Sequence, residues 1–207
     1  MLIGLDFDNT IVRYDRLFLR LAVERRLVPA SLPANKQAVR DFLRASGRED
    51  DWTELQGVAY GPRITDAEPF PGVKPFLSRC RAAGVDVAVI SHKTRQPYRG
   101  GKHDLHAAAL AFLDAHGFFA TSDTGLSPDR VFLEPTFAKK LARVGALGRT
   151  AFVDDLPEVL TERAFPRGVR RILFDPAGTH PDDPAYERVT SWAECGDLLL
   201  TPREAFA

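Results

Sequence analysis

Short apolar runs recur along the chain and constrain its fold more than any other feature. The runs occupy residues 2–7, 85–91, 130–135, 150–155 and 170–176. They are mostly continuous rather than strictly alternating, which is typical of strands that are buried on both faces. Segments with helical spacing of apolar residues lie between them, at residues 73–84, 104–117, 136–148 and 157–165. Strands that alternate with helices predict an α/β fold with a Rossmann-like, doubly wound parallel sheet.

The interval between the first two runs is too long for a single crossover helix. Residues 14–69 contain two further helical patterns, at 16–28 and 36–47, which the stretch "PASLP" separates. We therefore expect a small helical cap at residues 14–69, inserted after the first strand. Residues 1–13 and 70–207 would then form the core domain.

Composition excludes several classes of protein. The 28 Lys and Arg residues balance the 28 Asp and Glu residues, which argues against a broad electrostatic surface for nucleic acid. No apolar run approaches the roughly 18 residues that a membrane-spanning helix needs. The first residues also lack the regions of a secretion signal, so we expect a cytoplasmic protein with no membrane partner. Cys80 and Cys195 are too few for a disulfide framework or a zinc site, and we expect both to be reduced.

Acidic and hydroxyl side chains occupy the ends of the predicted strands. Asp6 and Asp8 end the first strand, Ser91 ends the second, and Asp154 with Asp155 ends the fourth. Ligands of open α/β sheets bind at the carboxyl ends of the strands. Neighbouring carboxylates repel each other unless a proton or a cation neutralises them, and clustered oxygens suit Mg²⁺. Together with a lysine from the helix start at 139–140, this set is suited to phosphoryl transfer.

Four short motifs carry a resemblance to a known family. "DFDNT" at residues 6–10 resembles the DxDxT motif of the haloacid dehalogenase (HAD) superfamily, and "VISHKT" at 89–94 resembles its second motif. The lysines at 139–140 and "FVDD" at 152–155 are similar to the third and fourth. The motifs occur in the family's order over nearly the whole chain. The resemblance implies a HAD core with a small helical (C1-type) cap and a Mg²⁺-dependent phosphatase.

The resemblance also implies a role for each motif residue. Asp6 would attack phosphorus and become phosphorylated, while Asp8 would protonate the leaving group and then activate water. Thr10 would shape the loop, Ser91 would hydrogen-bond a phosphoryl oxygen, and a lysine would balance the negative charge. The dehalogenases of the superfamily lack an acid two residues after the nucleophile, so Asp8 favours phosphate chemistry.

The same resemblance predicts the metal ligands and the substrate contacts. Asp6, the backbone carbonyl of Asp8 and one or both of Asp154 and Asp155 would hold Mg²⁺. Substrate contacts are expected from Asn9, Ser91, His92 and Lys93. We prefer Lys140 to Lys139 as the motif lysine, because "KLARV", which begins at Lys140, has the Lys-apolar-x-x-apolar pattern common for this motif. Lys139 lies about 100° around the helix and would point elsewhere.

Two questions remain open at the level of sequence. The expected function is hydrolysis of a small phosphorylated substrate, with two alternatives: a phosphotransferase with a hydroxyl acceptor, or a non-catalytic binding protein on a HAD fold. The basic stretch at 93–103 is either a mobile loop that contacts an anionic substrate or a solvated surface loop. His103 and His106 are expected to be capping or surface residues rather than metal ligands.

Overall fold

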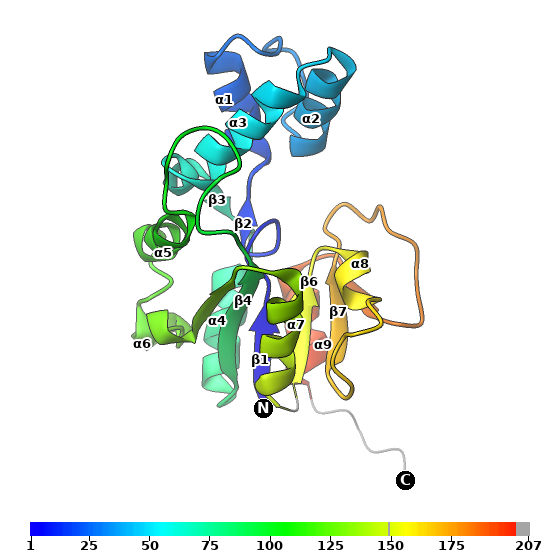
Figure 1. The fold of residues 1–207 in the computed structure, drawn as a ribbon. Coiled ribbons are helices and arrows are strands. Elements are labelled where there is room, and N and C mark those ends of the chain that lie inside the picture. The colour runs from blue at the N-terminus through cyan, green and yellow to red at the C-terminus, as the bar shows by residue number, and fades with distance from the viewer. Residues whose placement is uncertain (149, 202–207) are drawn as a thin grey trace. The chain divides into compact units, whose positions relative to one another are not determined.

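The computed structural model describes residues 1–148 and 150–201, and the chain forms two compact units (Figure 1). The first, which we call the sheet unit, comprises Met1–Ile11, Phe70–His92 and the chain from Gly117 onward. The second, which we call the helical unit, comprises Val12–Pro69 and Lys93–His116. Each unit has its own core, and each is described in turn.

Within the described residues, six strands of the sheet unit form one parallel sheet. Their order is β5-β4-β1-β6-β7-β8, with β1 at the centre. The strands are Leu2–Leu5 (β1), Asp86–His92 (β4), Val131–Glu134 (β5), Thr150–Asp154 (β6), Arg170–Phe174 (β7) and Glu187–Val189 (β8). Every neighbouring pair is parallel. The predicted Rossmann-like α/β class is therefore confirmed, and five of these strands coincide with the apolar runs of the sequence.

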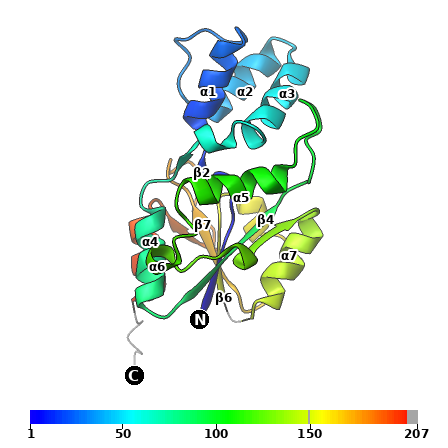
Figure 2. The same cartoon turned by 90° about the vertical axis from the view of Figure 1, so that its left-hand side faces the viewer.

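Helices cover both faces of this sheet. Figure 2 shows α4 and α6 on one side of the strands and α7 on the other. The helix α9 packs beside α4, and α8 packs on β6 and β7. The bounds of the helices are Val73–Ala82 (α4), Thr121–Thr124 (α6), Phe137–Ala146 (α7), Pro157–Leu160 (α8) and Trp192–Leu200 (α9), with a 3₁₀ turn at Pro128–Arg130 (η2).

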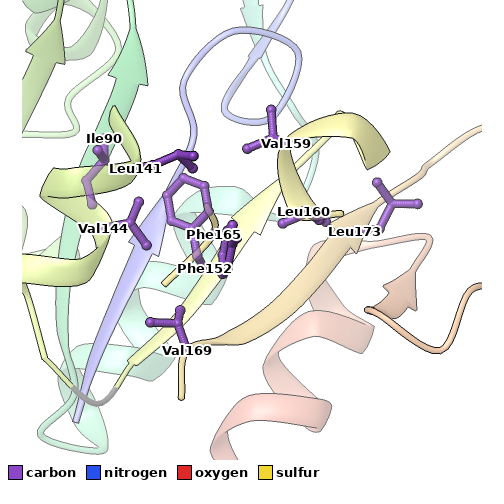
Figure 3. Close-up of a cluster of buried hydrophobic side chains, with 9 residues drawn as sticks. All are labelled: Ile90, Leu141, Val144, Phe152, Val159, Leu160, Phe165, Val169 and Leu173. Carbon is purple, nitrogen blue, oxygen red and sulfur yellow. The ribbon is translucent and has the colours of Figure 1, made fainter. Parts of the chain in front are cut away.

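A cluster of buried apolar side chains fixes α7 and α8 to the sheet (Figure 3). Leu141 and Val144 extend from α7 toward Phe152, which is fully buried on β6. The remaining members come from β4, α8, β7 and the intervening loops: Ile90, Val159, Leu160, Phe165, Val169 and Leu173. Burial of a large apolar side chain contributes about 1.5–3 kcal/mol each, so this cluster holds α7 firmly in register with β6.

The opposite face of the sheet is sealed by aromatic rings. The Trp192 ring of α9 lies 4.9 Å from the Phe76 ring and 4.9 Å from the Phe174 ring, measured between centroids. Cys80 and Cys195 are buried free thiols on α4 and α9. Burial raises the pKa of Cys80 to about 12, so this thiol stays protonated at neutral pH.

The helical unit is built from α1, α2, α3 and α5. These helices span Asp15–Glu24, Lys36–Ala45, Glu49–Tyr60 and Leu105–Ala115, with a 3₁₀ turn at Ile64–Asp66 (η1) and a short antiparallel pair, Val12–Arg13 (β2) and Glu68–Pro69 (β3). Side-chain caps begin two of the helices: Asn35 accepts the N–H of Ala38, and Asp104 accepts those of His106 and Ala107. Among the described residues, no helix has both the length and the apolar character that crossing a membrane requires.

The helical unit contains more of the chain than the expected insertion at 14–69. Residues 93–116, which the sequence analysis left in the core domain, cluster with residues 12–69. Two glycines let the 93–104 segment pack closely against α3: Gly57 lies within the helix, and Gly61 directly follows it. A Cβ atom at Gly57 would overlap the carbonyl oxygen of Arg99, and one at Gly61 would lie 3.2 Å from Cβ of His103. Glycine thus lets the backbone of the 93–104 segment approach the helix directly.

Candidate active site

The register of the sheet brings Asp6, Ser91 and Asp154 to the same edge. Leu5 pairs with Val89 of β4 and with Val153 of β6, so the residues that follow all lie at the carboxyl ends of the three strands. The Asp6 N–H continues the ladder by donating to the Val153 carbonyl oxygen at 2.8 Å. Asp6 and Asp154 are consequently neighbours on adjacent strands, and both side chains are buried.

Lys140 joins these two carboxylates. Its Nζ lies 2.7 Å from Asp6 Oδ1 and 2.6 Å from Asp154 Oδ2. The Lys140 side chain is only 4% exposed, whereas Lys139 is exposed to solvent. The helix α7 begins at the Thr136 cap, whose hydroxyl accepts the Lys139 N–H, and its buried Leu141 follows Lys140 directly. The contact with Asp6 and Asp154 therefore belongs to Lys140, the lysine that the sequence analysis preferred.

Asp6, Lys140 and Asp154 shift one another's pKa values through their charges. Burial raises the pKa of Asp6, and the nearby Asp8 adds to that rise, although Lys140 and the hydrogen bond from Ser91 oppose it. Burial and the charge of Asp6 raise the pKa of Asp154 to about 7, against the opposing effect of Lys140. Burial alone would lower the pKa of Lys140, but the two carboxylates outweigh it and raise the pKa. One buried ammonium thus faces two carboxylates, and the site attracts further positive charge.

A tight turn follows Asp6 and positions Asp8, Asn9 and Thr10. The Ile11 N–H donates to the Phe7 carbonyl oxygen at 3.0 Å, and Asn9 adopts a left-handed backbone with φ of 57°. Asp8 and Asn9 are half-buried. Thr10 is fully buried, and its hydroxyl donates to Asp155 Oδ1 at 3.4 Å. The turn therefore links the first motif to the acidic pair after β6.

Three carboxylates of the predicted metal set converge. One oxygen from each of Asp6, Asp154 and Asp155 lies within 4.8 Å of the others. This donor set is all oxygen and carries an excess of negative charge over Lys140, so it fits a hard divalent cation. The Asp8 side chain is not part of the cluster, and the predicted ligation through its backbone carbonyl stays a prediction.

Comparison with known proteins identifies the fold. No model of a protein family matches the chain, and the search of curated proteins found no relative. Among solved structures, a HAD family hydrolase from Deinococcus radiodurans, determined with bound phosphate and sodium, is 19% identical and aligns over 97% of each chain with a TM-score of 0.59. A dehalogenase, 14% identical, aligns over 97% of each chain with a TM-score of 0.56. The fold is that of the HAD superfamily. Protein tyrosine kinase A of Mycobacterium tuberculosis is likewise similar. It is 18% identical, and the alignment covers 96% of this chain and 97% of that chain with a TM-score of 0.63.

The other predicted substrate contacts of this HAD fold divide between the two units. Ser91 belongs to the sheet unit, is buried, and hydrogen-bonds Asp6 through its side chain. His92 ends β4 and is exposed. Lys93 belongs to the helical unit, where its buried Nζ lies 5.1 Å from the centroid of the Tyr60 ring. Contacts of Asn9, His92 and Lys93 with a substrate stay predictions.

The basic stretch after Ser91 is packed against the helical unit. Arg95 pairs with Asp104 at 2.7 Å and Arg99 with Asp50 at 3.0 Å. His103 Nε2 bonds the Gly100 carbonyl at 2.8 Å, and His106 Nε2 bonds that of Lys93 at 2.8 Å. These contacts fix the stretch to its own unit and give each of the two imidazole rings a backbone partner.

Asp175 is a buried acid at the same sheet edge that the sequence analysis did not single out. It follows β7, and its carboxylate accepts the N–H groups of Thr179 at 3.1 Å and His180 at 2.9 Å. Arg188 lies 3.6 Å away. The strand-end pattern "ILFDP" matches that of Asp6 and could have revealed it, but these contacts assign Asp175 to holding the loop after β7.

Proposed function

We propose that this chain hydrolyses phosphomonoesters through a phosphorylated Asp6. The observation that carries the proposal is the buried Asp6 carboxylate held by Lys140, beside Asp154 and Ser91 and two residues before Asp8. The ammonium orients the Asp6 carboxylate and opposes the effect of burial on its pKa, which favours the ionised form that a nucleophile needs. The HAD fold adds support, because its strand ends gather the same types of residue in the same order.

The reaction would proceed in two steps, phosphorylation of Asp6 and hydrolysis of the acyl phosphate. An Asp6 oxygen attacks phosphorus and forms an acyl phosphate, the ester bond to the leaving oxygen breaks, and Asp8 gives that oxygen its proton. Asp8, now ionised, then takes a proton from water as the water attacks phosphorus. Inorganic phosphate leaves, Asp6 is regenerated, and Asp8 is protonated again.

The remaining residues would stabilise the charge on the transferred group. The Ser91 hydroxyl would donate to a phosphoryl oxygen, and Lys140 would offset the negative charge that Asp6 shares with the phosphoryl group. Asp6, Asp154 and Asp155 would hold Mg²⁺, which when bound supplies charge neutralisation at the phosphoryl oxygens. Thr10, through Asp155, would keep the acidic pair and the first motif in register.

Dehalogenation is an alternative activity for this fold, since a dehalogenase is among the similar structures. Asp8 argues against it, because the dehalogenases of this superfamily lack an acid two residues after the nucleophile. A carbon–halogen bond needs no proton on the departing halide, whereas an alkoxide leaving group does. The presence of Asp8 therefore favours phosphate esters as substrates.

Phosphoryl transfer to a hydroxyl acceptor other than water is the alternative within phosphate chemistry. The similarity to a protein named tyrosine kinase A keeps this alternative in view. The two activities differ only in what attacks the phosphorylated Asp6. Product analysis with added acceptor alcohols separates them, because transfer yields a new phosphate ester and hydrolysis yields inorganic phosphate alone.

A substrate panel tests the proposal directly. Purified protein is assayed for phosphate release from sugar phosphates, nucleotides and small phosphorylated metabolites, with Mg²⁺ and with EDTA. We expect turnover with Mg²⁺, at least about a hundredfold less in EDTA, and none with Asp6→Asn. Halide release from 2-haloacids is measured in parallel. If wild type and Asp6→Asn are equally inactive on every phosphate ester, the proposed phosphatase activity is refuted and a binding role gains support.

A further inference from the structure

Four arginines are concentrated in the crossover from α8 to β7, in the stretch "RAFPRGVRR" at residues 163–171, which contains no acidic residue. The whole stretch belongs to the sheet unit. Phe165 anchors it in the apolar cluster of Figure 3, and Pro166 lies against α7, where a Cβ atom added to Gly145 would come within 3.2 Å of the proline ring. The crossover is therefore packed onto the sheet, and its arginines extend from an ordered backbone.

A pocket lies where this crossover enters β7. It has a volume of about 260 Å³, and its lining comes from the start of β7 (Val169, Arg170 and Arg171) and from residues 184–187 at the start of β8. Tyr186 packs against the apolar cluster, and its hydroxyl donates to the Pro181 carbonyl oxygen at 2.9 Å. One side of the pocket is thus held by the core of the sheet unit.

The pocket lies at the opposite end of the strands from the catalytic acids. Arg170 pairs with Ala151 of β6, which precedes Asp154 by three residues. At about 3.3 Å per residue, the two positions are about 10 Å apart along the strands. A molecule bound in this pocket would therefore leave the catalytic acids free.

The two arginines of the pocket are held by partners that do not use all of their donors. The Arg171 guanidinium lies over the Phe165 ring, 4.6 Å from its centroid, and its Nη1 donates to the Leu160 carbonyl oxygen at 2.7 Å. Arg170 donates from Nε and Nη2 to one oxygen of Glu187, at 3.0 and 2.9 Å. Because a guanidinium carries five N–H donors, both side chains keep donors for a ligand.

Positive charge exceeds negative charge around the pocket. Glu187 offsets Arg170, and the carboxylate of Asp183, the nearest acid before the lining residues, accepts the Ala185 N–H at 2.7 Å. Arg171 has no ion-pair partner in the part of the chain that the structure describes. Because its side chain is half-buried, water screens this charge less than at an open surface. The pocket therefore favours an anion.

Arg167 adds a further positive charge beside the pocket. It is exposed, and it precedes the lining residue Val169 by two positions, with Gly168 between them at a φ of 81°. Arg167 likewise forms no ion pair with a described residue. Two residues of chain span at most about 7 Å, so the pocket is within reach of its flexible side chain.

We propose that Arg167, Arg170 and Arg171 form a non-catalytic binding site for a phosphate group. The planar fork of a guanidinium matches the oxygens of a phosphate, and its weak hydration lowers the cost of binding. The shared ligand chemistry is a phosphate dianion, which inorganic phosphate and phosphate monoesters both present. The inference does not depend on the proposed function, and its test requires no turnover.

Titration followed by amide NMR tests the site in the full chain. Protein in EDTA is titrated at constant ionic strength with inorganic phosphate, with methylphosphonate as a phosphate-ester mimic that cannot be hydrolysed, and with acetate. We expect saturable shifts at residues 167–171 and 184–187, with a dissociation constant of about 1 mM or lower for phosphate or phosphonate. The tighter of the two identifies the source of the anion. Absence of shifts in both ranges, or acetate that binds as tightly, overturns the phosphate site.

Substitutions distinguish a defined site from a general attraction of anions. Arg171→Gln should weaken phosphate binding at least about tenfold, because a hydrogen bond to a charged group is worth that factor or more. Arg167→Gln, at an exposed position, should weaken it at least about threefold and leave the fold intact.

Arg163→Gln is the matched control. It removes the same charge from the same stretch but outside the pocket lining, so affinity should stay within about twofold. Should Arg171→Gln fail to fold, the comparison of Arg167→Gln with Arg163→Gln decides. Equal losses of affinity in the control and the pocket variants would indicate diffuse electrostatic attraction and overturn the site.

Discussion

The Lys140 ammonium lies between the Asp6 and Asp154 carboxylates, 2.7 Å from one and 2.6 Å from the other. Asp6 directly follows β1 and Asp154 is the last residue of β6, while the lysine comes from a helix that the cluster in Figure 3 anchors to the same sheet. The three groups are buried together, so each depends on the others for its charge state. This dependence makes the site testable through stability as well as through activity.

The two adjacent lysines give a matched pair of variants. Lys140→Met should reduce kcat/KM at least about a hundredfold, because it removes the positive charge beside the nucleophile. It should also destabilise the fold at pH 7 by about 3–5 kcal/mol, since two buried carboxylates lose their counter-ion. Lys139→Met, an exposed neighbour, should keep activity within about twofold. Enzyme kinetics and urea denaturation check both effects, and equal loss in the two variants would contradict the assignment.

The raised pKa of Asp154 predicts how stability depends on pH without metal. A carboxyl with a pKa of about 7 in the folded state and 3.8 in the unfolded state binds its proton more tightly when folded. Its stabilising effect is complete below pH 3.8 and is lost as the pH rises toward 7, by up to a few kcal/mol. Asp6, whose pKa is also raised, acts in the same direction. The contribution of Lys140 to the free energy of unfolding does not change over this pH range, because its pKa lies above 10.5 in the folded state and the group stays protonated.

Urea denaturation in EDTA between about pH 4.5 and 7.5 measures this effect. The free energy of unfolding of wild type relative to Asp154→Asn should fall as the pH rises. Added Mg²⁺ should reverse the fall at neutral pH, because it favours the ionised carboxylates. A difference between wild type and Asp154→Asn that stays flat across this range would show that Asp154 is ionised throughout.

Much of the sheet unit could be predicted because buried parallel strands are continuous apolar runs that end in polar residues. That pattern located β1, β4, β5, β6 and β7, and with them Asp6, Ser91 and Asp154 at the expected edge. The strand β8 was missed, because Glu187–Val189 is a short edge strand without an apolar run. Lys140 was preferred because "KLARV" resembles the family's lysine motif, and the structure shows the physical reason: Lys140 is buried beside Leu141, whereas Lys139, about 100° around α7, is exposed.

Two features of the helical unit were harder to predict: the helix α3 and the membership of residues 93–116. The helix α3 contains Gly57 in its interior, which lowers its helix propensity. The assignment of 93–116 to this unit depends on glycines that let the backbone approach α3, and nothing local in the sequence reports such a contact.

Asp175 should stabilise the loop after β7 through its backbone hydrogen bonds. Asp175→Ala leaves the N–H groups of Thr179 and His180 without their acceptor, so the free energy of unfolding should fall by about 2–4 kcal/mol. Asp182→Ala is the matched control, because Asp182 also pairs with Arg188 but is 85% exposed in its side chain. That variant should change stability by less than about 0.5 kcal/mol. Chemical denaturation of the two variants at pH 7 compares them, and equal effects would argue that the Arg188 pairing matters rather than the backbone contacts.

Gly57 on α3 should be intolerant of a methyl group. Exchanging glycine for alanine inside a helix normally stabilises it by about 0.5–1 kcal/mol. At Gly57 the added Cβ would overlap the Arg99 carbonyl oxygen, so we expect a loss of about 1–3 kcal/mol in the free energy of unfolding. Gly196→Ala in α9 is the control, since its Cβ would meet only the end of the flexible Arg79 side chain. Urea denaturation shows whether each variant raises or lowers the free energy of unfolding. Hydrogen exchange should show faster amide exchange in residues 93–104 for Gly57→Ala alone. Stabilisation by Gly57→Ala would show that the 93–104 segment does not pack against α3 in solution.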